Sequence, residues 1–415
     1  MQKTGLALFA GALLALAGCS TPQTQSPNTN LAVSGVVGGS AAMLTLNGKV
    51  LDLSSATVTL NGEAASAAAV KAGMEISGSG IEDNGKVKVR DLEVRYRAKG
   101  QADQVDLAGK FVVVAGLKAL VSEKTLIFQE NADKTETALT LADLAAGDYL
   151  KVAGIPQPND PHDTIVATRL ERESEDDPSR VELMVPIRNL DQTAKTFSYG
   201  LKTYTVDYSK AEVRGTLVEG SVVRFRGAQS GTTITALRVR ATQGKEKPGV
   251  PDGTRIELQG LVGNLNPTAQ TFQVEGLTVD YSAATVIGTL AEGARVEVNG
   301  TISGTTVKAI RVKVEDDKED GEKPGEAELE GKIADFNATA QTFTVNGVTV
   351  SVNDQTVYQQ DKVGGKSLTD KGGDDKGNHL TAQEFWGSDR TGQMVEVKGV
   401  ANSSTAVLAR KIELK

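Results

Sequence analysis

The sequence has one cysteine, one tryptophan and two histidines among its 415 residues, and only 4% of the residues are aromatic. A single cysteine excludes an internal disulfide framework and a cysteine-ligated structural zinc site. The two histidines, His162 and His379, leave little for histidine-dependent chemistry. The 44 glycines and the scarcity of large aromatic residues favour many short strands and turns over long helices.

The N-terminus resembles a bacterial lipoprotein signal. Lys3 precedes an uncharged apolar run that ends in Leu16-Ala17-Gly18-Cys19, and residues 20–30 are polar. The resemblance implies that residues 1–18 are a cleaved signal peptide, that the Cys19 thiol carries a lipid, and that residues 19–30 form a tether. Ser20 after Cys19 favours the outer membrane in a diderm organism. The alternative is an ordinary secreted protein with an incidental cysteine.

A repeat runs through the remainder of the chain. A glycine, an alternating strand and a second glycine seven positions later recur five times, and successive first glycines lie 74, 73, 73 and 99 residues apart. The five pairs are Gly73 and Gly80, Gly147 and Gly154, Gly220 and Gly227, Gly293 and Gly300, and Gly392 and Gly399. We therefore predict five tandem modules, numbered 1 to 5, at residues 31–98, 99–172, 180–242, 254–315 and 327–415. Module 5 carries an insertion at 359–386.

The strand between the paired glycines predicts the fold of each module. Alternation places Val296 and Val298 on one face of a strand and Glu297 on the other. The bracketing glycines suit turns that need a positive φ, or a close strand crossing. A short antiparallel sheet that is apolar on one face is best satisfied by closing into a barrel. We expect an all-β chain of small five-stranded, OB-like antiparallel barrels joined by flexible linkers.

The order of these strands is similar to that of a known family. A Phe-x-Val strand is followed by a Leu-x-x-Gly-x-x-Val-x-Val-x-Gly strand and an Ala-x-x-Ile strand. This order resembles the bacterial domain-of-unknown-function family 5666, best over residues 180–314, then over 327–415, and least over 31–172. The resemblance implies β-rich envelope modules, often found in lipoproteins, and implies no reaction.

Acidic residues gather in the predicted linkers. Residues 171–180 carry a net charge of −3 and residues 315–326 a net charge of −5, while the whole chain carries −8. A third linker at 242–253 contains two prolines. We interpret the acidic linkers as solvated spacers, with weak cation binding as the alternative. Residues 370–378 in the insertion faintly resemble a calcium loop but lack its later acidic residue. Phe385 and Trp386 are predicted to anchor that insertion by packing.

No catalytic constellation stands out in the sequence. The histidines lie in different modules, and no glycine-rich loop precedes a helix. Asp207 and Asp280 occupy matching places in Val-Asp-Tyr-Ser texts, which predicts a turn-capping role. We predict a chain that is not an enzyme and that has no cofactor and no metal site.

Module 3 differs from its relatives in its surface charges. Arg224, Arg226, Arg238 and Arg240 lie on two strands, and alternation predicts that they face solvent. In modules 4 and 5 the acids Glu297 and Glu396 are predicted to pair with Arg311 and Lys411 across strands. Module 3 lacks such acids, so its four arginines are the candidate anion-binding residues.

These patterns predict a lipid-anchored protein of the cell envelope that acts as a spacer or as a binding module. Its membrane partner is lipid attached at Cys19, and an envelope polymer or protein is a candidate ligand. Nucleic acid is not expected, because the net charge is negative and aromatic residues are few. Two alternatives stay open: a protein that binds an envelope glycan or polymer, and a component of an envelope protein complex.

Overall fold

The computed structural model describes eleven stretches of the chain, and almost all their regular structure is β, so the all-β prediction is confirmed. The described residues are 30–40, 42–83, 85–133, 135–160, 163–173, 179–200, 204–241, 250–315, 326–360, 379–403 and 405–415. The predicted signal peptide, Cys19 and the central parts of the three predicted linkers lie outside these stretches. Within them, no helix combines the length and the apolar character needed to cross a membrane.

Module 5 shows the barrel in its simplest form. Its strands are β30 (Glu326–Asn337), β31 (Thr342–Val345), β32 (Val348–Ser351), β35 (Met394–Ser403) and β36 (Ala406–Leu414). The last strand pairs antiparallel with β35 and parallel with β32, which closes the ring β30-β31-β32-β36-β35. This is a closed five-stranded barrel with the strand order of an OB fold, as predicted.

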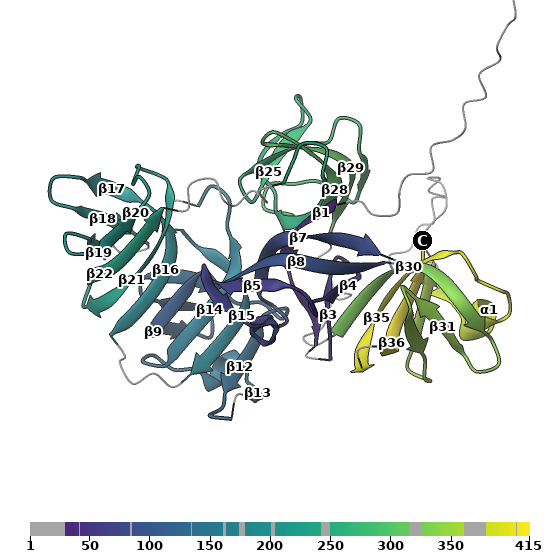
Figure 1. Cartoon of the computed structure of the whole chain (residues 1–415). Helices are drawn as coiled ribbons and strands as arrows, with labels where there is room; N and C mark the ends of the chain where they lie inside the picture. Colours follow the sequence, from purple (N-terminus) through teal and green to yellow (C-terminus); the bar gives the residue numbers. More distant parts are fainter. Residues whose placement is uncertain are drawn as a thin grey trace, which may run out of the picture.

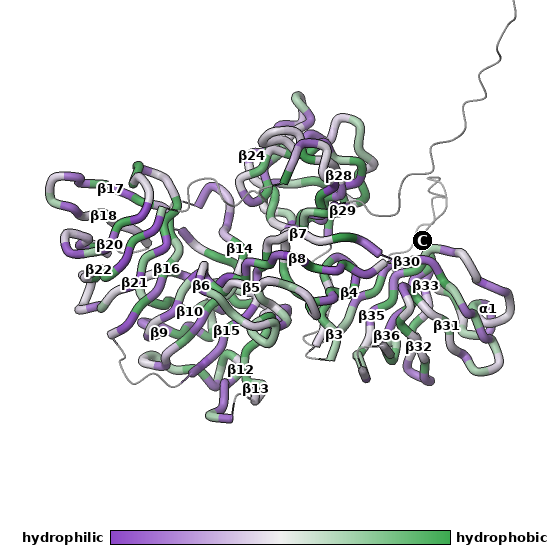
Figure 2. The backbone as a smooth tube through the Cα atoms, viewed as in Figure 1, coloured by the Kyte–Doolittle hydropathy of each residue, from purple (hydrophilic) through white to green (hydrophobic). Residues whose placement is uncertain are grey.

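Module 2 closes in the same way. It consists of β9 (Ala98–Asp106), β10 (Phe111–Val114), β11 (Leu117–Leu120), β14 (Tyr149–Pro156) and β15 (Ile165–Glu173). The third strand, β11, runs parallel to the fifth strand, β15, and β14 pairs with both β15 and β9. Apolar side chains of alternating residues fill the interior, and Figure 2 shows hydrophobic and hydrophilic residues alternating along these strands.

In modules 1, 3 and 4 the first barrel strand is broken in two by one buried apolar residue: Val37, Ile187 or Val262. Module 1 contains β1 (Asn30–Val36), β2 (Gly38–Ser40), β3 (Met43–Leu46), β4 (Lys49–Asp52), β7 (Glu75–Asp83) and β8 (Lys86–Arg95). Module 3 contains β16 (Arg180–Pro186), β17 (Arg188–Asp191), β18 (Thr196–Tyr199), β19 (Tyr204–Asp207), β21 (Val222–Ser230) and β22 (Thr233–Ala241). Module 4 contains β23 (Arg255–Leu261), β24 (Gly263–Asn266), β25 (Thr271–Val274), β26 (Leu277–Asp280), β28 (Arg295–Ser303) and β29 (Thr306–Val314).

Each module also has a short strand that the sequence analysis did not predict, parallel to the last barrel strand. These are β5 (Thr57–Leu60), β12 (Leu126–Glu130), β20 (Glu212–Arg214), β27 (Thr285–Ile287) and β33 (Val357–Gln360). Smaller elements follow three of them: β6 (Glu63–Ala65) and η1 (Ala67–Ala69), β13 (Glu136–Ala138) and η2 (Leu141–Asp143), and β34 (His379–Leu380) and α1 (Ala382–Trp386). The added strand widens the outer sheet face of every module.

The repeated glycines have two separate physical causes. The first glycine of every pair has a positive φ, for example +76° at Gly293 and +85° at Gly392, a conformation that other residues rarely adopt. The second glycine lies at a β-bulge where the neighbouring strand approaches closely. A Cβ placed on Gly300 would lie 2.4 Å from the carbonyl oxygen of Lys308, and on Gly399 it would lie 2.2 Å from that of Leu408. Both predicted roles of the glycines are confirmed.

Strand pairing across module boundaries, which the sequence analysis did not predict, joins the barrels in pairs. β1 of module 1 runs parallel to β23 of module 4, from Leu31 opposite Arg255 to Ser34 opposite Leu258. β9 of module 2 pairs antiparallel with β16 of module 3. Modules 1 and 4 therefore share one sheet, and modules 2 and 3 share another. Figure 1 shows module 1 in the centre, with modules 2 and 3 on one side of it and module 5 on the other.

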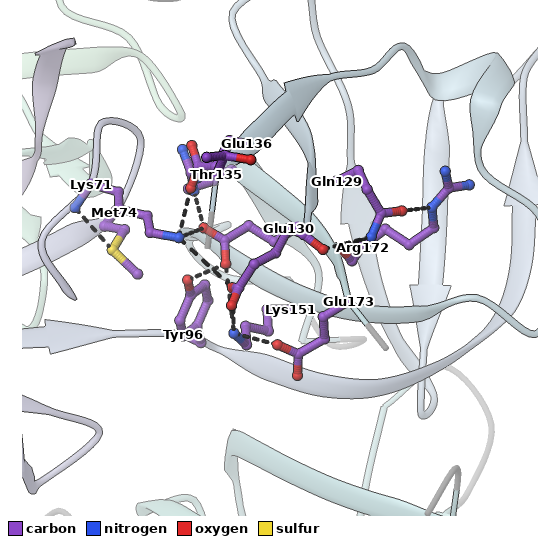
Figure 3. A network of polar contacts seen from close by, with 12 residues as sticks. Lys71, Met74, Tyr96, Gln129, Glu130, Thr135, Glu136, Lys151, Arg172 and Glu173 are labelled. Atoms are coloured by element: carbon purple, nitrogen blue, oxygen red, sulfur yellow. Dashed lines mark hydrogen bonds and ion pairs between the residues drawn. The ribbon is translucent and has the colours of Figure 1, made fainter. Parts of the chain in front are cut away.

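Module 1 also contacts modules 2 and 5 directly. Its Met43 and Val50 belong to the same apolar cluster as the core of module 5. Toward module 2, Lys71 reaches into a group of carboxylates and lies 2.6 Å from Glu136 (Figure 3). It also lies 3.3 Å from Glu171. The Tyr96 hydroxyl donates a hydrogen bond to Glu171 at 2.6 Å. Module 1 is thus the central module of the assembly.

Four acids assigned to solvated spacers are instead part of the folded body, so the spacer interpretation is wrong for them. Glu173 lies at the end of β15 and pairs with Lys99 at 2.7 Å. Glu171 is fully buried at the end of β15, Glu326 is 5% exposed at the start of β30, and Glu315 pairs with Arg295 at 2.9 Å. Burial alone raises the pKa of the Glu171 carboxyl, but the Arg169 charge and the Tyr96 hydrogen bond outweigh it and lower the pKa. Module 1 covers the end of β15 at Glu171, whereas Glu315 and Glu326 pair with Arg295 and Arg410 of their own modules.

The predicted cross-strand pair of module 4 is also wrong. A bulge between Asn299 and Gly300 shifts the register, so that Arg311 lies opposite Asn299 and Lys313 lies opposite Glu297. Arg311 extends instead to Glu330 of module 5, at 2.9 Å. The alternation of residues identified the charged face correctly, but the bulge decided the partners.

In module 5 the predicted pair between Glu396 and Lys411 does not form either. Glu396 lies opposite another acid, Glu413, and Lys411 pairs with that acid at 3.2 Å. Glu396 is neutralised by Lys415 at 2.7 Å and by Lys313 of module 4 at 3.2 Å. These charges lower the pKa of the Glu396 carboxyl, although burial opposes them.

The boundary between modules 4 and 5 therefore holds a cluster of buried and partly buried charges, to which Arg295 and Arg311 add the partners of Glu315 and Glu330. Its members are Glu297, Lys313, Glu315, Glu328, Glu330, Glu396, Lys398 and Lys415. Burial, together with the nearby Glu396 charge, raises the pKa of Glu328 to about 7. Because the folded state favours the protonated carboxyl, the stability that Glu328 contributes is complete below pH 4.5 and is lost as the pH rises through 7.

We predict that Glu328→Gln removes part of this pH dependence. The free energy of unfolding of the wild-type chain should fall by about 1–3 kcal/mol between pH 5 and pH 8, and the variant should lose less, because an amide carries no charge to bury. Denaturant titrations at the two pH values measure this, with the exposed Glu123→Gln as the control. Equal pH slopes in wild type and Glu328→Gln would contradict the prediction.

Candidate functional site

Five arginines lie side by side on the outer sheet face of module 3. Arg224 on β21 is directly opposite Arg240 on β22, and Arg240 is in turn opposite Arg214 on β20. Two residues further along β21, Arg226 lies opposite Arg238 on β22. Residues that are directly opposite on neighbouring strands point to the same face, so the five guanidinium groups share one surface. The structure therefore brings together all four predicted arginines and adds Arg214.

These arginines line a pocket between module 3 and module 1. Its volume is about 190 Å³. The lining residues are Asn61, Gly62, Glu63, Glu182, Arg214, Arg224, Phe225, Arg226, Arg238 and Arg240. Module 3 supplies the arginines, and the tip of the β5–β6 hairpin of module 1 supplies the opposite wall. Five arginines against two glutamates give the pocket a positive lining.

The hairpin tip is held against module 3 by specific contacts. The Asn61 side-chain amide donates to Glu182 at 2.8 Å, and its carbonyl oxygen accepts from the Tyr96 backbone at 3.0 Å. Gly62 has a φ of +79°, and a Cβ there would lie 2.6 Å from Nη1 of Arg240. The positive φ favours glycine at this tip, whereas Nη1 is the end of a flexible side chain that can move aside.

Arg224 is the most buried arginine of the pocket, with a side chain 11% exposed. Its Nη1 lies 3.5 Å from Glu93 of module 1, and its Nε is buried without a hydrogen-bond partner among the described residues. Burial lowers the pKa of this guanidinium, and the Glu93 charge only partly opposes that effect. The prediction that Arg224 faces solvent is therefore wrong, because module 1 covers this part of the sheet.

Arg238 has acids on both sides. Its Nη1 lies 2.8 Å from Glu63 of module 1, and its Nε lies 3.1 Å from Glu212 on β20. Glu212 also accepts from Arg214, at 2.7 Å. Arg226 and Arg240 are exposed and make no ion pair or hydrogen bond with any residue in the described part of the chain. The pocket thus contains the guanidinium groups of Arg226 and Arg240, which form no ion pair among the described residues, and the buried Nε of Arg224.

The sequence identified the arginines, but the prediction that module 3 lacks acids across from them is wrong. Glu212 lies opposite Arg238 and pairs with it, and Glu182 lies opposite Arg226. The acids that module 1 brings to the arginines were not predicted. Glu63 and Glu93 lie more than a hundred residues before Arg224 and belong to another module, so no spacing links them. A comparison of modules 3 and 4 could have identified Arg214. The charged Glu212-Val-Arg214 of module 3 stands where module 4 has the uncharged Thr285-Val-Ile287.

Several other residues singled out in the sequence have no described position. Cys19, His162 and the calcium-like segment 370–378 lie outside the described residues, and His379 begins β34. In the described part of the chain, no group of three or more histidine, cysteine, aspartate or glutamate side chains is arranged to hold a metal ion.

The aromatic pair and the repeated aspartates have structural roles, as predicted. Phe385 is fully buried, and the Trp386 indole donates a hydrogen bond to the Tyr358 hydroxyl at 3.0 Å inside the core of module 5. The Asp207 carboxylate accepts from the Ser209 backbone at 2.8 Å, and Asp280 accepts from Ser282 at 3.0 Å.

Comparison with known proteins finds a domain of unknown function, DUF5666, whose family model matches residues 99–171, 259–313 and 330–413, about half of the chain. The matches fall on modules 2, 4 and 5, whereas the sequence analysis predicts the best resemblance over residues 180–314 and the least over 31–172. No curated protein matches. A solved chain described as "drosophila Unr CSD456" is 15% identical over 56% of this chain and 96% of that chain. The TM-score of this match is 0.13.

We predict that Arg224→Met leaves the fold as stable as wild type or raises its free energy of unfolding by about 1 kcal/mol. The substitution removes a buried charge with one weak partner, and an apolar side chain of similar length replaces it. The matched control is Arg169→Met in module 2. Arg169 is 1% exposed and lies 2.5 Å from both Glu171 and Glu136, so its loss should cost about 3–5 kcal/mol. Denaturant titration of both variants tests this, and equal losses of stability would contradict it.

Proposed function

Since the chain belongs to the DUF5666 family, whose domain has no known function, we propose a function from the pocket itself. The chain is a non-enzymatic, lipid-anchored protein of the cell envelope, and it binds an anionic group between modules 1 and 3. The observation that carries this proposal is the set of arginines that face one another across β20, β21 and β22.

In this arrangement the neighbouring acids neutralise only part of the positive charge. Like charges directly opposite on neighbouring strands destabilise a sheet, and Arg224 lies opposite Arg240 with no acid between them. Arg226 and Arg240 have no partner among the described residues, and the buried Nε of Arg224 has none either. An anion that accepts hydrogen bonds from these groups would remove both the repulsion and the unsatisfied donor.

The size of the pocket limits what the ligand can be. Sites for drug-sized molecules usually occupy about 300–1,000 Å³, and this pocket has about 190 Å³. It therefore suits a small charged group, either free or at a chain end of a larger envelope glycan. The compact arrangement of the five modules supports a binding role over an extended spacer. Membership of an envelope protein complex stays an alternative, and crosslinking in intact envelopes would test it.

We predict that Cys19→Ala releases the protein from membranes. The prediction follows from the sequence around the single cysteine, which resembles a lipoprotein signal. Two or three acyl chains on that cysteine are enough for a stable membrane anchor. Detergent-phase partitioning of wild type and variant from the producing cells measures the change. If both forms partition alike, the lipid-anchor proposal is wrong.

We predict that the double substitution Arg226→Gln and Arg240→Gln weakens binding of anionic envelope glycans at least ten-fold at low salt. The two exposed guanidinium groups contribute charge-assisted hydrogen bonds, and binding by wild type should fall steeply as salt screens them. The measurement is equilibrium binding to the full chain at low and at high salt.

A matched control removes the same charge elsewhere. Lys308→Gln combined with Lys332→Gln changes two exposed residues of modules 4 and 5 that have no ion pair in the described part of the chain. This control should bind like wild type. An equal loss of binding in both double variants would show a diffuse charge effect and would overturn the pocket.

A further inference from the structure

The pocket already contains a carboxylate from module 1 that is bound to one of its arginines. Glu63 begins β6, at the hairpin tip, and its carboxylate lies 2.8 Å from Nη1 of Arg238. Its side chain is 70% exposed, and Arg238 is its only partner in the described part of the chain. The interaction is therefore a solvent-exposed ion pair, which contributes little stability and is easily exchanged.

The other acids around the arginines are held more firmly. Glu93 is 27% exposed and accepts from the Thr59 hydroxyl at 2.5 Å. Glu182 accepts from Asn61 at 2.8 Å, and Glu212 bridges two arginines. Each of these carboxylates has a further anchor or lies in a strand of the wall. Glu63 alone among the four combines high exposure with a single partner.

The charges of the cluster indicate which ligand would complete it. The arginines are Arg214, Arg224, Arg226, Arg238 and Arg240, and the acids are Glu63, Glu93, Glu182 and Glu212. With all four acids in place the cluster has a net charge of +1, and with Glu63 displaced it has +2. A phosphate ester carries about −1.5 to −2 at neutral pH, whereas a carboxylate carries −1.

We propose that the pocket binds a phosphate monoester group and that Glu63 is the resident counter-ion which this group displaces from Arg238. The inference rests on the proposed anion-binding function and names its ligand class and its competitor. Arginine suits this ligand, because its planar guanidinium donates two parallel hydrogen bonds to phosphate oxygens. Arg224 on β21 lies directly opposite Arg240 on β22, where neighbouring strands are about 5 Å apart. Arg238 lies two residues before Arg240 on the same face of β22, so the three guanidinium groups converge on a space that fits one tetrahedral group.

The test compares wild type with Glu63→Gln. The amide keeps the size of the side chain and removes the competing charge, so the variant should bind inorganic phosphate about three-fold more tightly than wild type at low ionic strength. Glu123→Gln, an exposed change in module 2, makes the same change of charge far along the chain and should leave the affinity unchanged. Calorimetric titration of the full chain in detergent measures all three proteins, with acetate as the competing carboxylate.

The outcomes separate this inference from the proposed function. Tighter phosphate binding by Glu63→Gln alone, with phosphate preferred to acetate, supports the inference. If wild type and Glu63→Gln bind phosphate equally, and Arg226→Gln with Arg240→Gln abolishes that binding, the pocket binds anions and the displacement is wrong. A preference for acetate overturns the ligand class. If neither phosphate, acetate nor an envelope glycan binds wild type, the proposed function itself fails.

Discussion

Neutralisation of charges that point out of the barrels is the constraint on which the assembly of the five modules depends. Alternation fills each barrel with apolar side chains and places charged residues on the outer face. Neighbouring modules then cover that face, and a covered charge without a partner costs several kcal/mol. Arg169 with Glu171, and Lys313 with Glu396, show how a charge of one module finds its partner in the same or the next module.

The pocket in module 3 departs from this rule, and the departure gives it functional interest. The outer face of module 4 has Glu297 and Lys313 opposite each other, but the same positions in module 3 hold Arg224 and Arg240. Module 1 supplies Glu93 and Glu63 to this face, yet Arg240 stays without a partner among the described residues. A sheet face that keeps unfavourable like charges sacrifices stability, which is expected where a ligand supplies the missing charge.

Much of the barrel could be predicted because its causes are local. The positive φ at Gly293 and the close strand approach at Gly300 are required by one turn and one bulge, and both leave a fixed seven-residue spacing in the sequence. The cross-strand partners could not be predicted in the same way. The bulge at Asn299 moves Arg311 away from Glu297, and its effect on register depends on the partner strand.

The sequence by itself determined the repeat, the all-β barrels and the four arginines that set module 3 apart, since each follows from alternation and glycine spacing within one module. Only the tertiary structure decided that β1 pairs with β23, that module 1 lies at the centre, and that Glu63 and Glu93 meet the arginines. The physical reason is that contacts between modules depend on surfaces distant in the chain. Tertiary packing brings these surfaces together, and the repeat within one module does not predict which surfaces will meet.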